Sequence, residues 1–293
     1  MASDLVERAP AKVNLTLRVL GRRADGYHDI ESLVVFADLG DRLTLTPGND
    51  LALSVAGPRA AHSGAEADNL VLKAARALAA RVPGLLTGAF FLEKNLPVAA
   101  GLGGGSADAA AALRLLVRAN KLAPDDQRLA EAARTTGADV PVCLDPRSRL
   151  MRGIGDILSA PLPVPRLPAI LVNPGVAVPT KLVFAGWRPS ANPVRASAAA
   201  ADFTSPKTTD ERQLLDWLAR EANDLEAPAI ALAPAIADVL ASLRAFAACR
   251  LARMSGSGAT CFALFSSAAD AVAAGNDLRA RCPDWWISET VLG

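Results

Sequence analysis

The residues best suited to chemistry form a glycine-rich segment near position 100. It reads Pro97-Val98-Ala99-Ala100-Gly101-Leu102-Gly103-Gly104-Gly105-Ser106-Ala107, and a run of helix formers follows from Ala109 to Val117. Glycines at this density let backbone N–H groups point inward without obstruction by Cβ atoms. At the start of a helix, such N–H groups and the helix dipole favour a bound phosphate. The segment therefore predicts a phosphate-binding loop, with Ser106 as the helix N-cap.

Two common nucleotide-binding motifs do not match the sequence of this segment. A Walker A loop has Lys and then Ser or Thr after its last glycine, whereas Gly105 is followed by Ser106 and Ala107. A dinucleotide-binding fingerprint would need a third glycine at position 106. The structural alternative is a flexible turn that binds nothing. The position of the glycines, directly between a predicted strand at Phe90-Phe91-Leu92 and a strong helix, argues against that alternative.

Two further residues have the chemistry that phosphoryl transfer to an alcohol requires. The reaction needs neutralisation of phosphate charge and a group that accepts the hydroxyl proton. Lys12 stands where the first predicted strand begins, and Asp139 follows a glycine ahead of Pro141, which suits the first turn of a helix. On spacing alone, however, a solvated lysine and a simple helix cap are the more economical explanations.

The bulk composition excludes several classes of protein. The formal net charge of +1 offers no field for a polyanion, so we expect no nucleic-acid partner. No window approaches the roughly 18 apolar residues of a membrane span, and we expect neither a signal peptide nor a membrane partner. The cysteines are far apart, which predicts neither a zinc cluster nor a disulfide framework: Cys143, Cys249, Cys261 and Cys282. A cytoplasmic protein is expected.

The elements that must position these residues alternate between strands and helices in both halves of the chain. In the first half we expect strands over 15–19, 32–37, 42–46 and 90–92, and a helix over 70–81 capped by Asp68 or Asn69. Prolines at 161, 163, 165 and 168 indicate a domain boundary. At 293 residues, two α+β domains are expected, over 1–160 and 161–293, and the last strand could pack back on the first domain.

The second half has its own set of expected elements. A strand over 169–173 comes first, followed by a long mobile loop over 186–210. Helices are expected over 210–221 and 229–247, then a strand, glycine turn and strand over 251–265. A further helix and a final strand near 285–290 complete the second domain.

The glycine loop resembles that of the GHMP kinases, a family named for galactose, homoserine, mevalonate and phosphomevalonate kinases. Their usual Gly-Leu-Gly-Ser-Ser-Ala is here Gly-Leu-Gly-Gly-Gly-Ser, a form typical of the branch that phosphorylates a cytidine diphosphate conjugate. Ala11-Lys12-Val13-Asn14, Asp25-Gly26-Tyr27-His28 and Gly137-Ala138-Asp139-Val140-Pro141 match the same branch. Ser255-Gly256-Ser257-Gly258-Ala259-Thr260 is similar to the third GHMP motif, although by spacing it could equally be a tight turn between strands.

The resemblance implies a fold and a set of roles. The fold would be an N-terminal domain like ribosomal protein S5 domain 2 and a C-terminal ferredoxin-like domain. Asp139 would be the base and Lys12 would orient the hydroxyl and offset charge. The residues implied near ATP are the loop 97–107 with Lys94 and Asn69; those near the acceptor are Asn14, Tyr27, His28, Thr180, Phe184, Gly256 and Ser257.

The implied reaction is transfer of a phosphoryl group from ATP to the 2-hydroxyl of 4-diphosphocytidyl-2-C-methyl-D-erythritol, in non-mevalonate isoprenoid biosynthesis. Mg²⁺ would be held mainly by the phosphates and water, with no metal site on the protein. Two alternatives remain: a GHMP kinase for another alcohol such as mevalonate or homoserine, and a nucleotide-binding regulator without catalysis. A fold like that of ribosomal protein S5 would also be compatible with binding of nucleic acid, but the near-neutral net charge disfavours that function.

Overall fold

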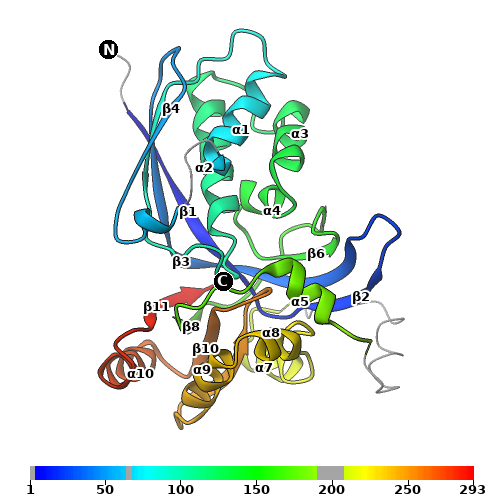
Figure 1. The fold of residues 1–293 in the computed structure, drawn as a ribbon, viewed down its shortest axis with the longest axis vertical. Coiled ribbons are helices and arrows are strands. Elements are labelled where there is room, and N and C mark those ends of the chain that lie inside the picture. Colours follow the sequence, from blue (N-terminus) through cyan, green and yellow to red (C-terminus); the bar gives the residue numbers. More distant parts are fainter. Residues whose placement is uncertain (1–3, 64–67, 190–207) are drawn as a thin grey trace. The chain divides into compact units, whose positions relative to one another are not determined.

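The computed structural model describes residues 4–63, 68–189 and 208–293 (Figure 1). Contacts divide the chain into two compact units built from interleaved segments. Unit 1 comprises 1–12, 39–98 and 103–146, and unit 2 comprises 13–38, 99–102 and 147–293.

Unit 1 contains a sheet in which the strand period of two decides which side chains are buried. β5 (Ala89–Glu93) pairs antiparallel with the second half of β3 (His28–Thr46) and parallel with β4 (Ala52–Ala56). β1 (Leu5–Asn14) also pairs with β3. In β5, Phe90 and Leu92 are buried whereas Phe91 is exposed, because successive side chains point to opposite faces.

In the described part of unit 1, four α-helices accompany the sheet, together with the 3₁₀ turn η1 (Ala60–His62). They are α1 (Leu70–Ala79), α2 (Gly104–Ala119), α3 (Gln127–Thr136) and α4 (Val140–Leu144). α2 packs against the other three. Its residues Ala109–Ala112 are fully buried, and such small side chains let neighbouring helices approach closely.

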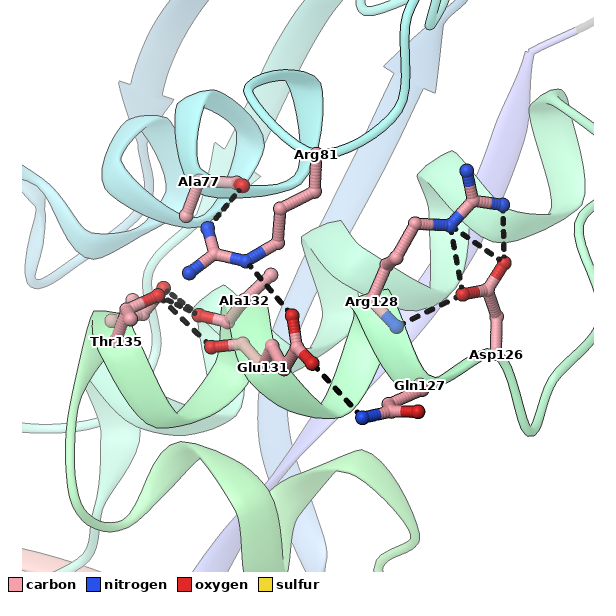
Figure 2. Close-up of polar contacts among 9 residues, drawn as sticks. Ala77, Arg81, Asp126, Gln127, Arg128, Glu131, Ala132 and Thr135 are labelled. Carbon is pink, nitrogen blue, oxygen red and sulfur yellow. Dashed lines mark hydrogen bonds and ion pairs between the residues drawn. The ribbon is translucent and has the colours of Figure 1, made fainter.

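Polar contacts fix the ends of α1 and α3, as Figure 2 shows. The carboxylate of Asp126 caps α3 by accepting from the Arg128 N–H at 2.9 Å, and it also binds the Arg128 guanidinium. Between the helices, Arg81 Nε lies 3.6 Å from the carboxylate of Glu131. These contacts are partly exposed, so we assign them a small share of the stability.

Unit 2 is organised around four antiparallel strands in the order β11-β8-β10-β9. The strands are β8 (Leu167–Asn173), β9 (Cys249–Met254), β10 (Cys261–Phe265) and β11 (Trp286–Leu292). Every residue of β10 is buried, as a central strand covered on both faces requires. β2 (Arg18–Arg22) and β6 (Arg149–Gly153) pair with the first half of β3, and β6 also pairs with β7 (Ile157–Leu158).

The helices of unit 2 pack against this strand set or against each other. α9 (Ala235–Arg244) packs on β9 and β10, and α10 (Ala268–Arg281) packs on β8, β10 and β11. α5 (Thr180–Gly186) packs against α8 (Glu226–Leu232), and α7 (Glu211–Leu218) precedes α8 in the chain. Within the described residues, none of the helices combines the length and apolar character needed to cross a bilayer.

Most of the expected elements are confirmed, including the helix capped by Asn69, the strand at 90–92, the strand at 169–173 and the final strand. Three expectations were wrong. The strands over 32–37 and 42–46 are one continuous strand, β3. The strand over 15–19 is wrong in its first part: residues 15–17 form the bend between β1 and β2, where Thr16 Oγ1 accepts from the Leu33 N–H, whereas Arg18 and Val19 belong to β2. The helix over 229–247 is two helices, because Pro234 lacks the N–H that a continuous helix needs.

The loop expected over 186–210 falls mostly outside the described residues. The division between residues 160 and 161 stays a prediction.

Candidate active site

The predicted phosphate loop forms the beginning of α2 in unit 1. The helix begins at Gly104 with Gly103 as its N-cap, so the expectation that Ser106 is the N-cap was wrong. Gly103 has φ +62, a conformation that costs glycine little and other residues more. Ser106 lies in the first turn instead, half-buried.

Lys12 connects this helix start to the predicted base. A Cβ atom on Gly103 would lie 3.2 Å from Lys12 Cε, so the aliphatic part of the lysine passes directly beside the N-cap. The ammonium of Lys12 then donates to Asp139 Oδ2 at 2.8 Å. The side chain of Lys12 is 5% exposed and that of Asp139 is 36% exposed. A solvated lysine at position 12 is thereby excluded.

Asp139 occupies the N-cap position of α4 without capping it. Its side chain makes no hydrogen bond to the first amides of α4 and binds Lys12 instead. Pro141 lies in the first turn of that helix, as expected. A half-exposed carboxylate held by a buried ammonium is suited to accept a proton from a bound hydroxyl.

The other two predicted ATP residues of unit 1 lie near the same helix start. Asn69 caps α1 by accepting from the Val71 N–H at 2.9 Å, and a Cβ on Gly105 would lie 3.4 Å from the neighbouring Leu70 side chain. Lys94 is buried, and its ammonium donates to two carboxylates, those of Asp41 and Asp108. A Cβ on Gly104 would lie 3.3 Å from Lys94 Nζ.

In unit 2, the glycine turn between β9 and β10 lies against residues 100 and 101. The Thr260 N–H donates to the Ala100 carbonyl at 3.1 Å, and Ser255 Oγ donates to the Gly101 carbonyl at 2.9 Å. A Cβ on Gly101, which has φ +77, would lie 2.4 Å from the Ser255 carbonyl oxygen. Only glycine fits at Gly101 without displacing the turn.

Asn14 is fixed in the same part of unit 2. Its backbone N–H donates to Ser255 Oγ at 3.1 Å and its Nδ2 donates to Ser32 Oγ at 2.7 Å. Among the described residues, the buried Oδ1 of Asn14 has no hydrogen-bond partner. A Cβ on Gly256 would lie 3.3 Å from that oxygen. An acceptor left open in this way is suited to a ligand hydroxyl.

Of the remaining predicted substrate residues, Thr180 and Phe184 lie on α5, and Ser257 and His28 contact them. The Thr180 and Ser257 hydroxyls are 2.8 Å apart, and Phe184 stacks on His28 with ring centroids separated by 5.0 Å. Tyr27 lies in the loop before β3 and is 59% exposed. The structure therefore brings His28 together with Phe184, while Tyr27 has a largely open side chain.

Burial, and then the charge of Arg22, lowers the pKa of His28, which keeps the imidazole neutral near pH 7. A neutral imidazole offers one hydrogen-bond donor and one acceptor.

Several side chains with a defined place around these groups received no role from the sequence. Ser32 and Ser255 hold Asn14, Trp187 meets His28 edge-on at 6.0 Å, and Asp41 and Asp108 hold Lys94. Serine and aspartate are common in turns and caps, so no spacing distinguishes these from ordinary positions.

Family models match both halves of the chain. The model of the GHMP kinases N terminal domain matches residues 69–145, and that of the GHMP kinases C terminal domain matches residues 207–284. Two curated relatives, both called 4-diphosphocytidyl-2-C-methyl-D-erythritol kinase, match nearly the whole length. That of Rhodopseudomonas palustris (strain HaA2) is 57% identical over 97% of this chain and 96% of its own. That of Methylobacterium radiotolerans is 59% identical over 98% and 99%.

The chain belongs to the GHMP kinase family.

Solved structures agree with this assignment. A crystal structure of 4-(cytidine 5'-diphospho)-2C-methyl-D-erythritol kinase is 36% identical, covers 99% of both chains and has a TM-score of 0.76. The homoserine kinase of Cytophaga hutchinsonii has a TM-score of 0.75 at 21% identity, over 99% of this chain and 95% of its own, which shows a shared fold. The expected two-domain GHMP fold is confirmed. As a GHMP kinase, the protein is an enzyme that uses ATP to phosphorylate a small molecule.

Proposed function

We propose that this GHMP kinase transfers the γ-phosphoryl group of ATP to the 2-hydroxyl of 4-diphosphocytidyl-2-C-methyl-D-erythritol. The 57% and 59% identity to two relatives of that name supports the choice of acceptor. The single structural observation that carries the chemistry is the 2.8 Å contact between Lys12 and Asp139, next to the N-cap of α2.

The roles follow from the charges of these two groups. The acceptor oxygen attacks the γ-phosphorus, its proton passes to the carboxylate of Asp139, and ADP leaves with the electrons of the broken P–O bond. Lys12 holds the Asp139 carboxylate in one orientation and offsets negative charge that develops on the transferred group. The N–H groups at the start of α2 bind phosphate oxygens. The transfer needs no covalent intermediate on the enzyme.

Mg²⁺ is part of the proposal as a companion of ATP. Among the described residues, no group of three His, Cys, Asp or Glu side chains could hold a metal ion. The first turn of α2 carries glycines and a serine and no carboxylate. These residues fit a Mg²⁺ ion that is held by the phosphates of the nucleotide and not by the protein. It would neutralise charge on the phosphates there.

The acceptor roles rest on unit 2. Asn14 Oδ1 is a buried acceptor that a substrate hydroxyl could satisfy. Tyr27 offers a largely open aromatic ring for stacking, and neutral His28 can both donate to and accept from the edge of a cytosine. Phe184, Thr180, Gly256 and Ser257 surround the same region of unit 2. A cytoplasmic location is proposed as well, supported by four free thiols in the described chain.

The test is release of ADP by purified protein with MgATP and each of three alcohols: the cytidyl conjugate, mevalonate and homoserine. Turnover with the cytidyl conjugate and neither of the others supports the proposal. Turnover with mevalonate or homoserine instead would retain the kinase chemistry and overturn the acceptor. ATP binding without turnover on any alcohol would favour a regulator.

A further inference from the structure

A buried charge cluster lies beside the phosphate loop and has no part in the mechanism above. Its members, which we call the Lys94 cluster, are Asp41, Lys94 and Asp108. All three belong to unit 1, and each is at most 4% exposed. Lys94 Nζ lies 2.5 Å from Asp41 Oδ2 and 2.6 Å from Asp108 Oδ2. Two carboxyl groups and one ammonium thus share a space closed to water.

The cluster contacts the loop itself. A Cβ on Gly104 would lie 3.3 Å from Lys94 Nζ, so the ammonium lies beside the first residue of α2. Asp108 stands one turn further along the same helix, four residues after Gly104. Lys94 and Asp108 therefore both adjoin the turn whose N–H groups are proposed to bind the phosphates of ATP.

The two carboxyl groups have unequal surroundings. Asp41 Oδ1 accepts the backbone N–H groups of Asn95 and Leu96 at 2.6 and 2.8 Å, in addition to the contact of Oδ2 with Lys94. Asp108 binds Lys94 through Oδ2, whereas its Oδ1 has no partner in the described part of the chain. Because hydrogen bonds from three donors stabilise the ionised form of Asp41, an extra proton in the cluster belongs on Asp108.

We propose that Asp108 is a positioning residue for ATP, which fixes Lys94 beside Gly104 and, when protonated, keeps the Lys94 cluster electrically neutral. The inference rests on the proposed use of the loop for ATP. When Asp108 ionises, the cluster gains a net negative charge beside the site for an anionic ligand, and the affinity for ATP falls.

Electrostatics support this assignment. Burial raises the pKa of Asp108 to about 8, against the opposing charge of Lys94. Burial would lower the pKa of Lys94, but the charges of Asp108 and Asp41 raise it, so the ammonium persists. Below about pH 8 Asp108 is protonated and the net charge of the cluster is zero, whereas above about pH 8 Asp108 is ionised and the net charge is negative.

The thiol that interacts with Asp108 has a pKa far above this range. From α4 the neighbour is Cys143, whose pKa is raised to about 12 by burial and by Asp139. Lys12, Arg114 and Asp108 also act on the pKa of that thiol. The buried faces of α1 and α3 present apolar side chains only, among the residues described.

The experiment compares wild-type protein with Asp108→Asn, which keeps the shape and removes the titration. Binding of a non-hydrolysable ATP analogue with Mg²⁺ is measured by calorimetry across pH 7 to 9.5, in two buffers of different ionisation enthalpy. We expect the wild-type Kd to rise about 3- to 10-fold across this range and binding near pH 8 to take up part of a proton. Asp108→Asn should show a flat Kd and no uptake. Asp125→Asn, an exposed aspartate of unit 1, is the control and should behave as wild type.

Each outcome decides the matter. Proton uptake and a rise in Kd that survive in Asp108→Asn would assign the titration elsewhere and overturn the inference alone. A wild-type protein that binds no nucleotide at any pH would overturn the proposed function as well. Should Asp108→Asn fail to fold, the wild-type measurement still decides, because an absence of proton uptake contradicts the inference.

Discussion

Lys12 Nζ lies 2.8 Å from Asp139 Oδ2, although 127 positions separate the two residues in the chain. The lysine stands on β1, where its stem passes Gly103, and the aspartate stands at the start of α4. The charge-neutralising group and the candidate base thus form one ion pair next to the phosphate loop, in which Lys12 is buried and Asp139 is partly exposed.

Replacing Asp139 by Asn should abolish most turnover without abolishing binding. The amide keeps the shape but cannot accept the hydroxyl proton, and general-base catalysis contributes roughly 10²- to 10⁴-fold. We therefore expect kcat to fall by about that factor while the Kd of the ATP analogue changes little. Steady-state kinetics and calorimetry measure the two effects. Unchanged turnover would remove Asp139 from the mechanism, and Asp125→Asn serves as the control.

Replacing Gly101 by Ala should weaken ATP binding far more than the same change at Gly84. Both glycines have similar positive φ angles, +77 and +75, so the backbone strain is comparable. A Cβ at Gly101 would meet the Ser255 carbonyl at 2.4 Å, whereas none of the described atoms lies within 4 Å of one at Gly84. We expect KM for ATP to rise by about 10-fold or more in Gly101→Ala alone. Equal effects of the two changes would contradict a role of that contact.

Replacing His28 by Ala should weaken binding of the acceptor substrate and leave binding of ATP unchanged. The change removes polar contact with the base and the ring that stacks on Phe184, so KM for the cytidyl conjugate should rise about 10-fold. KM for ATP, measured on the same variant, is the internal control. A parallel rise in both constants would indicate general damage to the fold instead.

The acceptor affinity should also depend on pH with a defined sign. Because burial, and then the charge of Arg22, lowers the pKa of His28, its neutral form should persist to a lower pH than that of a free imidazole. KM for the cytidyl conjugate should rise as the pH falls further and the imidazole gains a proton. The pH profile of His28→Ala should lack this rise.

Replacing Arg253 by Met should destabilise the fold. The Arg253 side chain donates to the carbonyls of Leu15, Leu218 and Glu221, all within 3.0 Å, and the residue is 7% exposed. Methionine would leave these carbonyls without that donor, and we expect a loss of about 3 kcal/mol in the free energy of unfolding. Arg250→Met, at an exposed position of the same strand, is the matched control. Chemical denaturation measures both; equal stability would refute the structural role.

The sequence by itself determined the local structure and the candidate chemistry. The glycine run at 101–105 and the alanines after it predict a turn and a helix because those preferences act over a few residues. The strand at 90–92 and the helix capped by Asn69 could be predicted for the same reason. The resemblance carried by Lys12, Asp139 and the loop led to the family that the relatives confirm.

Only the tertiary structure decided which of these residues meet. Whether Lys12 was solvated or paired depended on Asp139 reaching it from another element, and no local preference encodes that distance. Ser106 is a good N-cap by type, yet the N-cap is Gly103, three residues earlier, which adopts a left-handed conformation beside Lys12. The resemblance implied that Lys94 lies near ATP, but nothing in the sequence indicated its contacts with Asp41 and Asp108. A buried charge cluster exists only once β3, α2 and the segment after β5 pack together and exclude water.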